Sequence, residues 1–126
     1  MINKLFFVVL SILLTLSSAL AAEKPYDQST FNNLLSHNEP VVIHVHASWC
    51  PVCRAQQEIL DEILPTADFA KLTVLKADFD TEKALLRKYK VRNQSTFLVF
   101  RHGKEVDRST GDTDRDSIFR LLKEAF

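Results

Sequence analysis

A length of 126 residues is enough for one compact domain with a single hydrophobic core, and it leaves no room for a second domain. The 16 basic and 16 acidic side chains cancel, so the chain has no basic field for nucleic acid or anionic lipid and no acidic field for a cationic partner.

The N-terminal segment resembles a secretory signal peptide. Lys4 precedes an apolar stretch over residues 5–16, and Ala19-Leu20-Ala21 has the small-x-small pattern of a cleavage site. We expect residues 1–21 to be removed and residues 22–126 to form the mature domain. Its net charge is about −1, because the leader carries one base and no acid. The protein is therefore predicted to be periplasmic or otherwise exported.

An uncleaved membrane anchor is the alternative, and only in that case would the chain be attached to a membrane. Residues 5–22 approach the minimum length that spans a bilayer. Thr15, Ser17 and Ser18 dilute its apolar character and no basic cluster follows, so cleavage is the interpretation that we favour.

The first elements of the mature chain are short. Residues 24–27 are interrupted by Pro25, so we expect a strand there to be vestigial or absent. Ser29 or Thr30 can cap a helix that ends near His37. The apolar side of this helix carries Phe31, Leu34 and Leu35.

Residues 41–46 form a β-branched run that is typical of a strand covered on both faces. The twofold period of a strand directs alternate residues to opposite faces. The two sets are Val41, Ile43 and Val45 on one face, and Val42, His44 and His46 on the other.

The only two cysteines, Cys50 and Cys53, follow this strand and are separated by two residues. Pro51 suits the first turn of a helix, because its fixed φ is helical and its missing N–H has no partner there. The positive end of that helix would favour the Cys50 thiolate; the pKa of such cysteines falls from about 8.5 to about 3.5–7.5. We therefore predict that Cys50 is the nucleophile and that Cys53, less exposed, resolves the mixed disulfide.

A structural disulfide is the other interpretation of two cysteines in an exported chain. The loop between Cys50 and Cys53 is too short to add much cross-link entropy, and structural bridges usually join distant segments. A catalytic pair, with a reversible Cys50–Cys53 disulfide, is therefore favoured.

Helices and strands alternate after the cysteines. A helix is expected from residue 50 to about 64, a strand over 72–79, and a helix over 82–89 capped by Asp80 or Thr81. The apolar positions expected to face inward are Ile59, Leu60, Ile63, Leu64, Leu85, Leu86 and Tyr89.

The C-terminal part predicts a β-hairpin and a last helix. Residues 97–100 and 105–109 would pair around His102-Gly103-Lys104. Thr113 or Asp114 would cap the last helix. Its packing face would carry Ile118, Leu121, Leu122 and Phe126.

The segment Trp49-Cys50-Pro51-Val52-Cys53 after a strand resembles the active site of the thioredoxin superfamily. The resemblance covers residues 29–126 and includes Ile59-Leu60-Asp61-Glu62-Ile63, Lys71-Leu72-Thr73-Val74 and the hairpin around Gly103. It implies an α/β thioredoxin fold, with a central mixed sheet of four or five strands and helices on both faces. It also implies a thiol:disulfide oxidoreductase that needs no bound cofactor.

The resemblance also suggests supporting residues. Trp49 would form an apolar rim against which a substrate chain rests, or would be purely structural. His44 stands where the family often has a buried acid that moves protons for the resolving cysteine; the alternative, which we favour, is a core histidine satisfied by hydrogen bonds. Lys76 matches a lysine beneath the family's active site and could assist proton transfer, or it could be an ordinary edge residue.

The sequence departs from the family at Ser95. The family has a cis-proline followed by threonine where this chain has Ser95-Thr96, facing the cysteines and pairing with substrate. A cis bond before a non-proline residue costs about 2.5–4 kcal/mol, so we expect a trans bond unless tertiary constraints impose the cis form. We hypothesise that the Ser95 hydroxyl stabilises the Cys50 thiolate and that the site has a more open floor; drift without a chemical role is the alternative.

Val52 bears on the direction of electron flow. The strong exported oxidants of the family also place proline after the first cysteine, but they follow it with histidine and carry an inserted helical domain. Val52 cannot stabilise a thiolate, so we expect an intermediate reduction potential. The resemblance then implies a reductant or exchange protein, expected to be a monomer, that acts on exported protein thiols or disulfides and is recharged by a membrane electron donor.

Two other functional classes remain. Cys50 and Cys53 with a histidine such as His46 could bind zinc or copper(I), although no second cysteine pair and no His-x-x-x-His spacing supports a metal site. A redox-silent binding module is the second class, and the intact Cys-Pro-Val-Cys argues against it.

Overall fold

The computed structural model describes residues 21–126. The predicted leader, and its alternative as a membrane anchor, fall on residues that lie almost entirely outside this range. Within residues 21–126, no helix is long and apolar enough to cross a membrane.

Strands and helices alternate along most of the chain. The elements are β1 (Ala22–Pro25), α1 (Gln28–Ser36), β2 (Val41–His46), α2 (Pro51–Ile63), a short 3₁₀ turn (Ala67–Phe69), β3 (Thr73–Asp78), α3 (Lys83–Lys88), β4 (Thr96–Arg101), β5 (Lys104–Thr110) and α4 (Arg115–Lys123).

The five strands form one mixed sheet in the order β1-β3-β2-β4-β5. β3 is parallel to both β1 and β2, whereas β4 is antiparallel to β2 and to β5. The predicted α/β architecture with a mixed sheet is confirmed, and β2 lies at the centre of the sheet. The position matters because β2 leads directly into the cysteine segment.

β1 is the element that the sequence analysis expected to be vestigial or absent, and this expectation is wrong. It spans Ala22–Pro25 and pairs with β3 over its whole length, from Ala22 opposite Thr73 to Pro25 opposite Lys76. Pro25 is tolerated because it ends an edge strand, where the missing N–H leaves no central ladder position empty.

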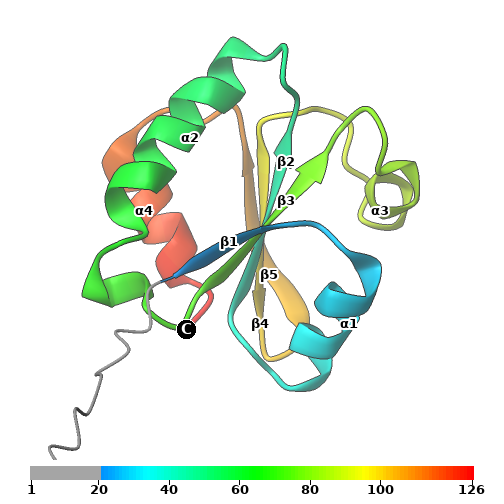
Figure 1. Cartoon of the computed structure of the whole chain (residues 1–126), viewed down its shortest axis with the longest axis vertical. Helices are drawn as coiled ribbons and strands as arrows, with labels where there is room; N and C mark the ends of the chain where they lie inside the picture. Colours follow the sequence, from blue (N-terminus) through cyan, green and yellow to red (C-terminus); the bar gives the residue numbers. More distant parts are fainter. Residues whose placement is uncertain (1–20) are drawn as a thin grey trace, which may run out of the picture.

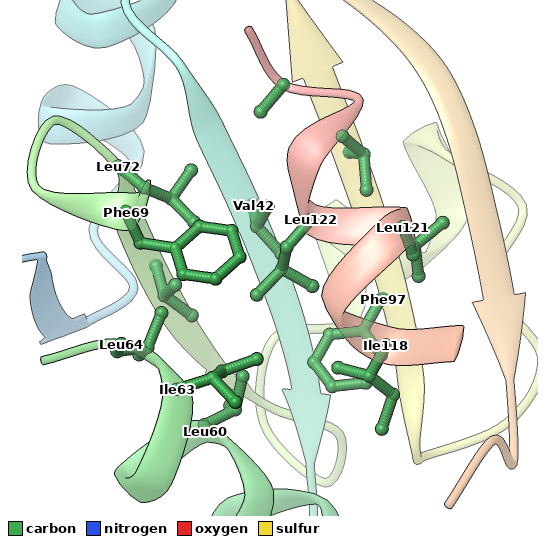
Figure 2. Packing of buried hydrophobic residues seen from close by; sticks show 13 residues of the cluster. Val42, Leu60, Ile63, Leu64, Phe69, Leu72, Phe97, Ile118, Leu121 and Leu122 are labelled. Carbon is green, nitrogen blue, oxygen red and sulfur yellow. The ribbon is translucent and has the colours of Figure 1, made fainter. Parts of the chain in front are cut away.

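Helices cover both faces of the sheet: α2 and α4 lie on one face, and α1 and α3 lie on the other (Figure 1). The predicted alternation along β2 is confirmed, since Val42 packs on the α2 and α4 side while Ile43 and Val45 pack on the other. Figure 2 shows the first cluster, in which α2, α4 and the sheet bring together Val42, Leu60, Ile63, Phe97, Ile118 and Leu122.

The predicted N-cap residues of two helices, α1 and α3, are wrong. Asp27, not Ser29 or Thr30, caps α1, because its carboxylate accepts a 2.8 Å hydrogen bond from the Thr30 N–H. Glu82 occupies the N-cap of α3 without a side-chain capping bond, so neither Asp80 nor Thr81 caps that helix.

The last helix agrees better with its prediction. Asp114 caps α4 by accepting a hydrogen bond from the Ser117 N–H at 2.7 Å. Ile118, Leu121 and Leu122 are buried as predicted. Phe126 is 43% exposed, so its assignment to the packing face is wrong; it follows the end of α4 and lies beyond the covered stripe.

Candidate active site

The two cysteines lie where β2 has ended and α2 begins. Cys50 is the N-cap residue of α2, with φ −93° and ψ 113°, and Pro51 is the first helical residue. The backbone N–H of Cys53 donates to Cys50 Sγ at 3.1 Å. The first sulfur therefore takes the place of a capping oxygen at the positive end of the helix, as the sequence predicted.

Both cysteines are free and buried. Cys50 is 1% exposed and Cys53 is fully covered, so Cys53 is the less exposed of the two as predicted, but only by a small margin. Ala47 packs against the pair, and the partly buried Phe79 lies beside them. Because water is largely excluded, hydrogen bonds within the site dominate the environment of both sulfurs.

The backbone at Ser95 adapts to the absence of proline. No peptide bond within residues 21–126 is cis, so the bond before Ser95 is trans as expected. Ser95 instead has φ +62°, in the left-handed region that costs a non-glycine residue about 1–2 kcal/mol. Its N–H donates to the Val45 carbonyl at 2.8 Å, a bond that proline cannot make. This bond ties the Ser95 loop to β2.

The hydroxyl of Ser95 lies between the two sulfurs. Its Oγ is 3.2 Å from Cys50 Sγ and 3.4 Å from Cys53 Sγ. These contacts agree with the hypothesis that Ser95 stabilises the Cys50 thiolate. The expected open floor is wrong, because Ser95 is only 4% exposed and covers the pair.

The surroundings of the two thiols separate their acidities. Burial alone would raise the pKa of Cys50, but hydrogen bonds from the Cys53 thiol, the Ser95 hydroxyl and the Cys53 N–H outweigh burial and lower it. Burial raises the pKa of Cys53, and its hydrogen bond to Cys50 adds to the rise. Cys50 is therefore the more acidic thiol and the better nucleophile, and Cys53 keeps its proton to a higher pH. Thiol–disulfide exchange with one attacking and one resolving cysteine requires this difference.

Gln56 is a buried polar residue that the sequence analysis missed. Its side-chain amide donates to the carbonyls of Ser95 (3.0 Å) and Asp112 (2.9 Å), and its Oε1 is 2.9 Å from His44 Nε2. Its spacing along α2 could have predicted its burial, because Gln56 continues the buried stripe formed by Cys53, Leu60 and Ile63. A glutamine on a core stripe indicates a buried hydrogen-bond network rather than a solvated face.

Known proteins are similar to this chain in sequence and in fold. The sequence profile described as thioredoxin matches residues 23–124. The chain belongs to the thioredoxin family. It is 32% identical over 111 residues to a thioredoxin of Mycobacterium tuberculosis, covering 88% of this chain and 95% of the relative. It is 34% identical over 82 residues to a thioredoxin of Chlamydia trachomatis, covering 65% of this chain and 78% of the relative.

Solved structures of similar proteins have the same fold. The crystal structure of Trxlp from Edwardsiella tarda has a TM-score of 0.78 and 36% identity, covering 80% of this chain and 98% of that one. A thioredoxin of Malassezia sympodialis has a TM-score of 0.73 at 21% identity, covering 84% and 91%, and supports the fold alone. The protein is a thioredoxin-like thiol:disulfide oxidoreductase.

His44 is fully buried and lies next to Gln56. Because both amide hydrogens of Gln56 point to carbonyls, its Oε1 must accept from His44 Nε2–H, which assigns the tautomer. Burial is the main reason that the pKa of His44 falls to about 4. An imidazole with that pKa is a weak base near neutral pH, so the contacts favour the core-histidine interpretation.

Trp49 and Val52 form the exposed apolar part of the site. Trp49 is 55% exposed and Val52 is 37% exposed. The Trp49 indole N–H donates to Asp80 Oδ2 at 2.8 Å, which joins the cysteine segment to the turn after β3. Trp49 thus has a structural tie and an exposed ring, so its contacts are compatible with both interpretations.

Lys76 and Thr96 do not contact the sulfurs through any hydrogen bond found within residues 21–126. Lys76 Nζ lies 3.9 Å from Glu23 Oε1, beside a cavity of about 540 Å³ that His46, Ser48 and Asp78 also line. Thr96 is 2% exposed, and its hydroxyl donates to the Asn93 carbonyl at 2.8 Å. Its buried side chain holds the loop rather than presenting a substrate contact.

The alternative metal site is not assembled. Among the described residues, no three His, Cys, Asp or Glu side chains are grouped so that they could hold a metal ion. Cys50 and Cys53 therefore lack the third ligand that the sequence analysis sought in His46.

Proposed function

We propose that this protein is an exported thioredoxin that reduces or exchanges disulfides in other exported proteins. Cys50 is the attacking thiol, and Cys53 is the resolving thiol. The observation that carries the proposal is the position of Cys50 Sγ at the start of α2, where it accepts the Cys53 N–H at 3.1 Å. A thiolate at that point is stabilised by the helix as well as by Ser95.

Trapping of mixed disulfides tests the two cysteine roles. Cys53→Ser should accumulate a mixed disulfide with a denatured client that contains a disulfide, because the nucleophile remains and resolution is lost. Cys50→Ser should trap none, and neither variant should catalyse insulin reduction by dithiothreitol. Equal trapping by both variants would contradict the assignment, and insulin reduction by Cys50→Ser would contradict the mechanism.

Export is supported by the leader pattern of residues 1–21. The full chain, expressed in a bacterium with two membranes, should appear in the periplasmic fraction with Ala22 as its N-terminal residue by mass spectrometry. A chain without residues 2–21 is the control and should stay in the cytoplasm. Recovery of the full-length mass in the membrane fraction would support the anchor instead, and cytoplasmic retention would contradict export.

The direction of exchange follows from Val52 and from the surroundings of the thiols. An uncharged Val52 leaves Cys50 with hydrogen bonds but no neighbouring cation between the cysteines, so the dithiol is less stabilised than in strong oxidants. The partner that returns electrons would be a membrane protein, because the substrate proteins lie outside the cytoplasm. Titration against glutathione should give a potential well below about −120 mV, the value of a strong periplasmic oxidant; a value at that level would reverse the direction.

A further inference from the structure

The resolving step needs a group that accepts the proton of Cys53. Cys53 must lose its proton before it attacks the mixed disulfide at Cys50, yet its sulfur is fully buried. His44 uses its Nε2–H for Gln56, and Lys76 faces Glu23. Neither side chain makes a hydrogen bond to Cys53 Sγ within residues 21–126.

Ser95 is the one side-chain group of the described chain that is hydrogen-bonded to both sulfurs. Its Oγ lies 3.2 Å from Cys50 Sγ and 3.4 Å from Cys53 Sγ, within the range of hydrogen bonds that involve sulfur. A hydroxyl has one donor and two acceptor lone pairs, so it can accept from one thiol while donating to the other sulfur. In the mixed disulfide the substrate sulfur is bonded to Cys50 Sγ, so the hydroxyl lies beside the bond that breaks as well as beside Cys53, as a single-step proton relay requires.

The hydroxyl is held in place by its own backbone. The Ser95 N–H donates to Val45 (2.8 Å), and its carbonyl accepts from Gln56 Nε2 (3.0 Å) and from the Gly111 N–H (2.9 Å). These three bonds fix a residue whose positive φ would otherwise be unfavourable. A preorganised group loses little entropy when it acts, which is what a relay between two buried atoms needs.

We propose that Ser95 is a catalytic proton relay that carries the proton of Cys53 to the leaving sulfur of the substrate. The inference deepens the proposed function and rests on its assignment of Cys50 as the nucleophile and Cys53 as the resolving thiol.

The reaction balances in two steps. The Cys50 thiolate attacks the substrate disulfide; one substrate sulfur leaves and takes a proton from water, and the other is bonded to Cys50. Cys53 Sγ then attacks Cys50 Sγ and its proton passes to Ser95 Oγ, while the Ser95 proton passes to the departing substrate sulfur. The bond between Cys50 and the substrate breaks, the cysteines are oxidised to a disulfide, and the substrate disulfide is reduced to two thiols.

Ser95→Gly is the informative variant, because glycine adopts φ +62° without strain and keeps the backbone bonds while it removes the hydroxyl. Ser95→Ala is a second variant without the hydroxyl, and Ser95→Thr keeps a hydroxyl; because a β-branched residue is disfavoured at φ +62°, Ser95→Thr is compared only if it unfolds like the native chain. Circular dichroism and thermal unfolding identify any variant that fails to fold. Asn93→Ala, which removes an exposed side chain of the same loop and leaves the hydroxyl in place, is a matched control.

The measurement is a single turnover with glutathione disulfide, in which the first and second release of glutathione report attack and resolution. The pH is set above the Cys50 pKa of every variant, so that a change in thiolate fraction does not affect the comparison. General acid–base groups contribute about 10²–10⁴-fold, and we expect Ser95→Gly to slow the second release by at least about tenfold. Ser95→Thr should recover most of the rate.

A solvent deuterium isotope effect provides the readout that a purely structural role would not move. The second release should be slowed in D₂O for the native chain, and this sensitivity should fall in Ser95→Gly because proton transfer no longer accompanies the attack. A Ser95→Gly second release at the native rate, with an unchanged isotope effect, would overturn the relay. If the native chain itself releases no glutathione, the proposed function fails rather than the relay.

Discussion

His44 is a fully buried imidazole whose Nε2 donates to Gln56 and whose Nδ1 has no hydrogen-bond partner. Protonation would place a second N–H at Nδ1 without an acceptor, in a ring stacked on Phe97 at 4.5 Å. Burial, together with the nearby His46 and Lys76, therefore lowers the pKa of His44 to about 4 from 6.5. The neutral ring is part of the native structure.

The free energy of unfolding should depend on pH through this residue. The unfolded chain binds a proton at His44 below about pH 6.5, whereas the folded chain binds it only below about pH 4. The contribution of His44 to the free energy of unfolding is therefore fully present above pH 6.5. It is lost as the pH decreases toward 4, and the loss is about 3 kcal/mol. Urea unfolding at a series of pH values measures the slope.

The variant His44→Gln tests whether His44 causes this dependence of the free energy of unfolding on pH. Glutamine can donate to Gln56 Oε1 in place of Nε2–H but does not titrate, so the fall between pH 6.5 and 4 should shrink. Identical slopes for the native chain and His44→Gln would show that His44 titrates normally.

Val52 is the second residue whose chemistry can be tested directly. Val52 is 37% exposed in the first turn of α2, so a histidine there fits without entering the core. An imidazolium near Cys50 should lower the thiolate pKa by about one unit and raise the reduction potential by about 30 mV. Iodoacetamide alkylation against pH and glutathione titration measure the two quantities, with Val52→Ala as the control. A Val52→His potential equal to that of Val52→Ala would contradict the argument.

At the scale of elements, the sequence predicted the strands and helices whose hydrophobic pattern lies entirely within their own residues. The run Val41–His46 and the stripe of α2 both appear where expected. β1 was missed because its four residues become a strand only by pairing with β3, about fifty residues away in the sequence. Sequence periodicity over four residues cannot report such a partner.

The β4–β5 turn makes an element-scale prediction about its glycine. His102 and Gly103 have φ +51° and +77°, as in the two-residue turns that match the twist of a hairpin. A Cβ on Gly103 would lie 3.2 Å from the Leu35 carbonyl at the end of α1. Gly103→Ala therefore combines backbone strain with a close contact against another element.

Gly111→Ala separates these two costs. Gly111 has nearly the same φ, +76°, but a Cβ there meets nothing within 4 Å. We expect Gly111→Ala to lower the free energy of unfolding by about 1–2 kcal/mol and Gly103→Ala to lower it by roughly a further 1 kcal/mol. Equal losses in urea unfolding would mean that α1 moves away from the turn at no cost.

For the whole molecule, the fold could be predicted more fully than the site. Burial patterns and turn residues depend on nearby sequence, and they placed the central strand, the long helix and the hairpin. The contact of Ser95 with both sulfurs depends on a positive φ and on bonds to Val45, Gln56 and Gly111, which come from three other parts of the chain. The sequence named Ser95, but only tertiary structure could place its hydroxyl.

The surface of the described residues leads to a last prediction, that a chain of residues 22–126 is a monomer. β5, one edge of the sheet, carries an exposed mixture of charges, and Arg108 forms an ion pair with Glu105. Charged edges resist pairing with a second sheet. β1, the other edge, spans only four residues. Among the large apolar side chains of the described residues, Trp49 is the most exposed, and it lies beside Cys50, where the resemblance suggested a rim for a substrate chain.

Analytical ultracentrifugation of residues 22–126, with the cysteines reduced, should therefore give the monomer mass at all concentrations up to about 100 μM, and small-angle scattering should give a radius of gyration of about 13 Å. Trp49→Ala should leave both values unchanged while weakening insulin reduction. A mass that doubles with concentration would contradict the prediction. Val106 on β5 is 39% exposed and serves as a second apolar surface site. If Trp49→Ala abolished that dimer and Val106→Ala did not, the self-association would lie at the Trp49 rim and would compete with the reaction.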